Sequence, residues 1–176
     1  MDVFTEKIIT EKEKKSITAW TDDSSSIKNF MWGISDDKVA KEHSDTLFSL
    51  FDKYSSNVKK GKILYRGMAV PDDLFKFMGY DKLVKGSDYT PDDKAISSFS
   101  TSKKVAYDFA FDGEHKQKVI IKIKSHNADM FDITDISSVA KEEETILTKS
   151  IWYNVTHIRK SEYGGVKWML IVLKKK

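Results

Sequence analysis

Three consecutive acidic residues, Glu142, Glu143 and Glu144, stand directly before Thr145 late in the chain. If this segment is extended, side chains alternate, so Glu142 and Glu144 project from one face while Glu143 points to the other. Two carboxylates in one small space raise each other's pKa unless a cation or a substrate lies between them. An acidic run is more often a solvated surface, so other parts of the chain must decide whether this one does chemistry.

Arg66 is a second residue that packing alone explains poorly. It lies in residues 62–68, a short, apolar, β-rich segment that follows Gly61 and reads as a buried strand. An arginine in such a strand must be paired with an acid, snorkel at an edge or reach a cleft. Its planar guanidinium suits a phosphate or a carboxylate, so a structural ion pair and an anion-binding role both remain open.

The third feature is a serine-rich strand end at residues 96–102. Alternation places Ser98, Ser100 and Ser102 on one face, although serine is a poor strand residue. Ser102 is explained as the N-cap of a helix that the apolar spacing of residues 105–110 predicts. Capping does not explain Ser100.

The elements that must position these residues divide the chain in two. Residues 1 to about 60 carry helical patterns, with helix starts at residues 21–24 and 35–37 and an apolar stripe between Val39 and Tyr54. A short helix is predicted over residues 71–78, with proline in its first turn. Further strands are predicted over 118–124, across the glutamate run, and over 151–158 and 167–173, the last two forming a hairpin. Residues 125–141 form a polar loop that is long enough to suggest a function.

Composition limits the class of protein. With 176 residues, 40% of them hydrophobic and 32% charged, the chain is expected to form one globular domain over residues 1–176. The absence of cysteine excludes disulfides, zinc–thiolate sites and a cysteine nucleophile. The four histidines lack ligand-like spacing, so we expect no metal. A net charge of +3 is too small to indicate a nucleic-acid partner.

Nothing in the sequence addresses the chain to a membrane. The first residues lack the basic head and apolar body of a signal peptide, and no apolar run approaches the roughly 20 residues of a membrane span. We therefore expect a cytoplasmic protein without a membrane partner.

Taken together, the order and spacing of the three features resemble the arginine-serine-glutamate class of mono-ADP-ribosyltransferases, which includes clostridial binary and C3-like toxins, vertebrate ecto-transferases and phage enzymes. Residues 20–29 also resemble, more loosely, the N-terminal helix of the toxins. The motifs that carry the resemblance are Leu64-Tyr65-Arg66-Gly67, Ser98-Phe99-Ser100-Thr101-Ser102 and Glu142-Glu143-Glu144-Thr145-Ile146-Leu147.

The resemblance implies roles for the motif residues, with NAD⁺ as co-substrate and no metal. Arg66 would hold the NAD pyrophosphate, and Glu144 would stabilise the oxocarbenium-like ribose as nicotinamide leaves. Ser100 would orient Glu144 and the cofactor, and Glu142 would align and deprotonate an acceptor arginine. The implied cofactor-binding residues are Tyr65, Arg66, Gly67, Ser100, Thr101, Ser102 and Glu144.

The resemblance also implies an α+β fold. Two packed, mainly antiparallel β-sheets would form the NAD cleft, with the N-terminal helices along one side; the sheet content of the C-terminal half supports this independently. Residues 1 to about 60 would be the helical part and about 61–176 the β-rich catalytic core. The loop at about 132–141 would recognise the target.

The implied activity is transfer of ADP-ribose to an arginine of a target protein, as in a single-domain phage-type enzyme that modifies host proteins. An injected effector or toxin component remains an alternative. So do an NAD glycohydrolase, in which water is the acceptor, and a binding module that kept the fold without catalysis. A nucleic-acid acceptor is permitted by the mild basic charge but not indicated by it.

Overall fold

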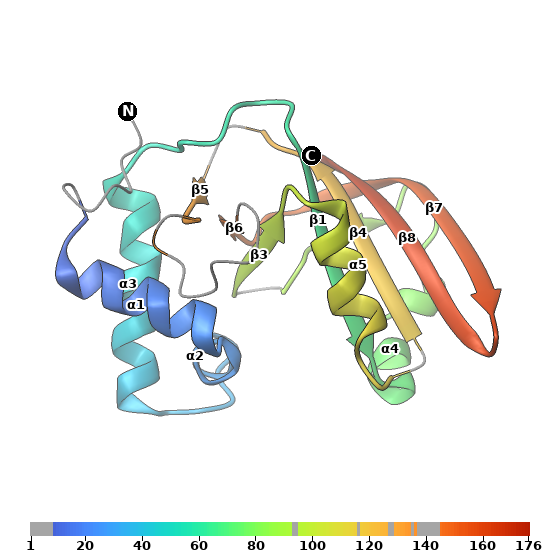
Figure 1. Ribbon diagram of the computed structural model, residues 1–176, viewed down its shortest axis with the longest axis horizontal. Helices are drawn as coiled ribbons and strands as arrows, with labels where there is room; N and C mark the ends of the chain where they lie inside the picture. The colour runs from blue at the N-terminus through green and yellow to red at the C-terminus, as the bar shows by residue number, and fades with distance from the viewer. Residues whose placement is uncertain (1–8, 93–94, 116, 127–128, 135, 137–144) are drawn as a thin grey trace.

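Three N-terminal helices lie to one side of a β-sheet (Figure 1). The computed structural model describes residues 9–92, 95–115, 117–126, 129–134, 136 and 145–176. The helices are α1 (Glu11–Asp22), α2 (Ser25–Met31) and α3 (Lys38–Lys53). A capping box between Thr10 and Glu13 starts α1, and the Asp37 side chain accepts a hydrogen bond from Ala40 N at the start of α3. The predicted N-terminal helices are thus confirmed within the described residues.

In the described residues after α3, the chain forms eight strands and three short helices. The short helices are α4 (Asp72–Phe77), the 3-10 helix η1 (Tyr80–Lys82) and α5 (Lys103–Phe111). The strands are β1 (Ile63–Val70), β2 (Asp88–Tyr89), β3 (Ile96–Ser100), β4 (Gln117–Lys124), β5 (Met130–Asp132), β6 (Thr145–Lys149), β7 (Tyr153–Tyr163) and β8 (Val166–Lys175). The predicted strands and the β7–β8 hairpin are confirmed where the structure describes them. β5 lies within the segment expected to be a polar loop.

The prediction of two separate sheets is wrong. The described strands form one sheet in the order β2-β7-β8-β4-β1-β3-β6-β5, antiparallel except for the parallel pair β4–β8. The two parts of this sheet meet at β1 and β3, where the structure gives one residue pair, Tyr65 opposite Ser100. Alternating patterns identify strands but not their partners, so sequence could not show that this pair joins the two parts.

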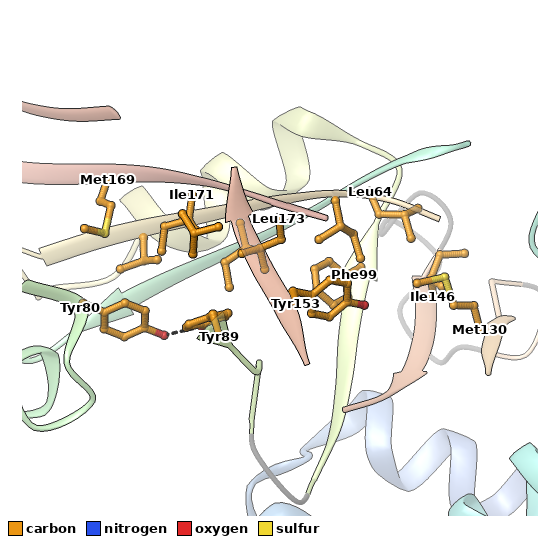
Figure 2. Close-up of a cluster of buried hydrophobic side chains, with 14 of the residues drawn as sticks. Leu64, Tyr80, Tyr89, Phe99, Met130, Ile146, Tyr153, Met169, Ile171 and Leu173 are labelled. Carbon is orange, nitrogen blue, oxygen red and sulfur yellow. Dashed lines mark hydrogen bonds between the residues drawn. The ribbon is translucent and has the colours of Figure 1, made fainter. Parts of the chain in front are cut away.

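The two parts of the sheet share one hydrophobic core (Figure 2). Leu64 on β1 and Leu173 on β8 belong to the same cluster as Phe99 on β3 and Ile146 on β6. The sheet therefore curves so that its two parts pack on one another. The expected packing is thus present, but the two parts belong to one connected sheet.

A second core fixes the N-terminal helices to β3, β5 and β6. Ile17 and Leu47, from α1 and α3, are buried in one cluster with Ile96, Phe131 and Leu147 from those strands. Burial of such side chains contributes roughly 1.5–3 kcal/mol each relative to exposure. The helices are therefore firmly placed against the strand that carries Ser100. No helix among the described residues is long and apolar enough to cross a membrane.

Gly67 lets α5 lie directly on β1. A Cβ atom at this position would lie 1.6 Å from the carbonyl oxygen of Ala106, which is backbone and cannot turn aside. The close approach explains why the first motif has glycine after Arg66, whatever else that glycine does.

We expect Gly67→Ala to lower the free energy of unfolding by about 3 kcal/mol, because α5 must move away from β1. Gly164→Ala is the matched control. Its Cβ would meet nothing within 4 Å, and only its φ of +59° is unfavourable, so it should cost about 1 kcal/mol. Urea denaturation followed by circular dichroism measures both. Equal losses would contradict the close packing of α5.

Candidate functional site

A cavity of about 260 Å³ opens where β1 and β3 part. Beyond the Tyr65–Ser100 pair, residues 66–70 of β1 have no strand partner on the β3 side among the described residues. The divergence leaves a gap that α5 bounds on one side and α2 on another. The residues around it are Ser24, Lys28, Tyr65, Arg66, Gly67, Met68, Ser98, Phe99, Ser100, Val105, Ala106 and Phe109.

Arg66 is at this cavity, and it is also in a buried ion pair. Its Nη1 donates to Oδ2 of Asp92, and the two side chains are 12% and 9% exposed. The structural ion pair, one of the two interpretations that the sequence left open, is therefore confirmed. Arg66 also lines the cavity, and its anion-binding role stays a prediction.

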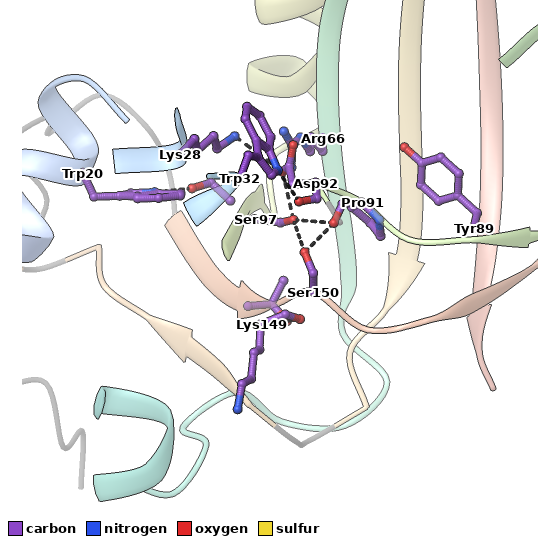
Figure 3. Close-up of polar contacts among 12 residues, drawn as sticks. Trp20, Lys28, Trp32, Arg66, Tyr89, Pro91, Asp92, Ser97, Lys149 and Ser150 are labelled. Carbon is purple, nitrogen blue, oxygen red and sulfur yellow. Dashed lines mark hydrogen bonds and ion pairs between the residues drawn. The ribbon is translucent and has the colours of Figure 1, made fainter. Parts of the chain in front are cut away.

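Asp92 is the centre of a larger polar network (Figure 3). Its Oδ2 also accepts hydrogen bonds from Ser97 Oγ at 2.9 Å and from Lys28 Nζ at 3.4 Å. Its backbone carbonyl oxygen accepts one from Trp32 Nε1 at 2.8 Å. Asp92 has a φ of 53°, the left-handed region that aspartate tolerates better than most residues. One loop residue thus joins α2, β1 and β3.

The pKa values of the three charged groups follow from this arrangement. Burial alone would raise the pKa of Asp92, but the charges of Arg66 and Lys28 outweigh burial and lower it. Burial also opposes the charge of Arg66, yet Asp92 raises its pKa overall. Burial and the neighbouring Arg66 charge lower the pKa of Lys28 to about 8, although Asp92 acts in the opposite direction. Two cations therefore line the cavity, and both are paired with the Asp92 carboxylate.

Trp20 connects the helical part to the serine strand. Its Nε1 donates to Ser98 Oγ at 2.7 Å, and Lys28 Nζ lies 5.5 Å from the centre of its ring. The ring is 3% exposed and belongs to the second core. The hydrogen bond therefore joins α1 to β3, and the cation–π contact joins α2 to α1.

The serine motif lies at the inner end of the cavity. Ser100 is buried, opposite Tyr65, and its Oγ accepts a hydrogen bond from Ser102 N at 3.0 Å. The Ser102 side chain accepts one from Val105 N at 3.2 Å, which caps α5 as the sequence predicted. Thr101 is partly buried between them. The structure thus brings together the implied cofactor-binding residues that it describes, namely Tyr65, Arg66, Gly67, Ser100, Thr101 and Ser102.

Glu142 and Glu144, the remaining predicted site residues, lie outside the described residues. The nearest described neighbour in sequence is Thr145, the first residue of β6, which pairs with Ser100. β6 therefore begins beside the serine motif.

Sequence reasoning missed Asp92 and Lys28. Asp92 belongs to residues 91–94, which carry the composition of an ordinary polar turn. Lys28 stands in the segment that resembles the toxin helix, but a lysine there is also typical of a solvated helix face. Within the described part of the chain, no group of three or more histidine, aspartate or glutamate side chains could hold a metal ion.

The sequence matches no protein-family model and no curated protein. Solved structures do match. Vis toxin, an ADP-ribosyltransferase from Vibrio splendidus, is 20% identical, with a TM-score of 0.66 over 96% of this chain and 76% of that one. Plx2a, an ADP-ribosyltransferase toxin from Paenibacillus larvae, is 17% identical, with a TM-score of 0.66 over 96% of this chain and 87% of that one.

C3stau2 from S. aureus, whose structure was solved with NAD, is 16% identical, with a TM-score of 0.64 over 96% of this chain and 89% of that one. Vis toxin has also been solved in complex with agmatine. The likeness extends over nearly the whole chain, so the fold is that of the arginine-serine-glutamate ADP-ribosyltransferase toxins, as the motifs implied.

We expect Asp92→Asn to lower the free energy of unfolding by about 3–5 kcal/mol near neutral pH, because Arg66 then keeps a buried charge without its counter-ion. The pKa of Asp92 is lower in the folded chain than its ordinary value of 3.8. Its contribution is therefore fully present above pH 3.8 and is lost as the pH falls through the lower folded value. Urea denaturation at several pH values should show the two proteins converging in acid.

The control for this prediction is Asp45→Asn. Asp45 pairs with Lys41 at 2.7 Å, but both side chains are exposed, so the change should have little effect at any pH. An Asp92→Asn protein as stable as this control would show that the Asp92 network does not stabilise the fold.

Proposed function

We propose that this chain is an NAD-dependent mono-ADP-ribosyltransferase that acts as a single domain and transfers ADP-ribose to an arginine of a target protein. The observation that carries the proposal is the cavity between β1 and β3, where Arg66 and Ser100 lie together in the fold of ADP-ribosyltransferase toxins. Neither residue is accounted for by hydrophobic packing, and both line the same gap.

The cations of the cavity suit the pyrophosphate of NAD. Arg66 has five N–H donors, of which Nη1 serves Asp92, so an arriving phosphate would be met by the others. Lys28 lines the same cavity and would supply a second positive charge. The related C3stau2 structure contains NAD, which supports the same ligand here.

The reaction would break the bond between the ribose C1′ and the nicotinamide nitrogen. The ribose then passes through an oxocarbenium-like state, which the carboxylate of Glu144 would stabilise. Ser100 would orient that glutamate, since β6 begins opposite Ser100 and Glu144 directly precedes β6 in sequence. A guanidinium nitrogen of the acceptor would form the new bond to C1′, and Glu142 would take its proton.

An arginine acceptor is supported by two observations. Two carboxylates two residues apart can align a planar guanidinium and remove a proton from it. Agmatine, the small molecule in one Vis complex, carries the same guanidinium group as arginine. The partner we propose is therefore a protein with an accessible arginine, such as a host protein.

The Glu variants test the proposed reaction directly. With NAD and agmatine, the unaltered chain should release nicotinamide and form ADP-ribosyl-agmatine. Glu144→Ala should reduce both by about a hundredfold or more, because it removes the carboxylate that stabilises the ribose cation. Glu142→Gln should abolish transfer while nicotinamide release to water survives. Chromatography with mass spectrometry measures both products.

Glu143→Gln is the matched control and should change neither product. Absence of nicotinamide release from the unaltered chain would contradict the proposal. The remaining interpretation would then be a binding module without catalysis. Release without any agmatine adduct would identify a glycohydrolase. Equal loss of both products in Glu142→Gln would remove the acceptor role of Glu142.

Lys28 gives a pH-dependent prediction. Its pKa of about 8 means that it is charged below that pH and neutral above it. Because the charged form attracts the NAD phosphates, KM for NAD should rise several-fold between about pH 7 and pH 9. Steady-state nicotinamide release measures this. Lys28→Met should remove the rise, and Lys28→Arg should keep KM low at both pH values. A rise that persists unchanged in Lys28→Met would contradict a role for Lys28.

A further inference from the structure

A second hollow, of about 670 Å³, lies at the end of the sheet where β1 begins and β4 and β8 end. The loop before β1 and strands β4 and β8 line it. Five lysines contribute to its lining: Lys60, Lys122, Lys124, Lys174 and Lys175. The described residues that line the hollow include no aspartate or glutamate, although Asp129 nearby acts electrostatically on the lining residue His126.

Sheet register explains why these lysines gather. Lys124 is opposite Ile63, and Lys122 is adjacent to Val172 in the parallel β4–β8 pair. Residues paired across neighbouring strands project from the same face, and positions two apart on a strand do the same. Lys122, Lys124 and Lys174 therefore point to one side, and Lys60 approaches from the loop.

The lysines of the hollow differ from three exposed lysines elsewhere in the chain in making no ion pair with a described residue. Exposed Lys41, Lys104 and Lys176 each pair with an aspartate within 2.9 Å. Within the part of the chain that the structure describes, none of the five hollow lysines makes such a pair. The whole chain carries a net charge of only +3, so this is a local concentration of charge. Their mutual repulsion is relieved only by an anionic partner or by salt.

The remaining lining selects among anionic partners. Ile63 and Val172, which share the face of Lys122 and Lys124, add an apolar surface between the cations. Among the described residues, no phenylalanine, tyrosine or tryptophan lines the hollow to stack a base, and no arginine offers a fork for phosphate. The cations also surround a concave surface, which a flat membrane would not fill. An extended protein segment with alternating acidic and aliphatic side chains fits all of these features.

We propose that this lysine hollow binds an acidic, partly apolar segment of a protein partner. Tyr65 lines the NAD-site cavity and pairs with Lys122, so the hollow adjoins that cavity on one face of the sheet. A partner bound in the hollow would thus lie beside the candidate site. The inference itself does not depend on the proposed reaction.

The test is direct binding by fluorescence anisotropy. The probe is a short fluorescein-labelled peptide of glutamate, aspartate and leucine, and its control peptide has glutamine and asparagine instead of the acids. Two variants are compared: Lys122, Lys124, Lys174 and Lys175 all changed to glutamine, and a matched one with Lys12, Lys15, Lys38 and Lys82 changed to glutamine. Both lose four charges, and all four control lysines are exposed.

We expect the hollow variant to bind the acidic peptide about tenfold more weakly or worse, and the control variant within about twofold of the unaltered chain. Added salt should weaken the binding, and the neutral peptide should not bind. Equal weakening in both variants would overturn the site, because only overall charge would then matter. Tighter, hollow-dependent binding of single-stranded RNA or of anionic vesicles would overturn the assignment to an acidic protein. The assay contains no NAD, so it is unaffected by failure of the proposed reaction.

Discussion

The ion pair between Arg66 and Asp92 is the interaction on which the arrangement of the site depends. A buried pair of this kind gives little net stability over an apolar pair of the same size, but it is costly to break. The ion pair instead fixes the positions of the elements around it. Asp92 also accepts hydrogen bonds from Lys28 and Ser97, and its backbone carbonyl accepts one from Trp32. Residues from α2, β1 and β3 therefore meet at one loop residue.

The cavity beside that carboxylate forms because the sheet must meet two opposing requirements. The two parts of the sheet must stay connected to share one core, yet a cleft needs the strands to part. A single pair, Tyr65 with Ser100, satisfies the first requirement. Two residues later, Gly67 allows α5 to lie on β1 at backbone distance. Tyr65 thus joins the two parts of the sheet, the strands part at Arg66, and α5 packs on Gly67.

Much of this could be predicted from the sequence because it depends on local patterns. The caps at Asp37 and Ser102, the β7–β8 hairpin and the buried β1 strand all have short-range signals. Strand pairing has none, which is why one sheet was expected to be two. Asp92 was missed because its role depends mainly on Arg66 and Lys28, which are 26 and 64 residues away in sequence. The predicted roles of Glu142 and Glu144 concern residues outside the described part of the chain and stay predictions.

Positive charge is arranged differently at the cavity and in the lysine hollow. At the cavity, Asp92 neutralises one of two buried cations. An anionic ligand is therefore attracted by one net positive charge and is repelled by the nearby carboxylate. Attraction there is moderate, and geometry selects the ligand. In the lysine hollow the charges lie near solvent with no acid among the described lining residues, so attraction acts at longer range and depends on salt. Selectivity at the first site therefore comes from hydrogen-bond geometry, and at the second from the match between charge and apolar surface.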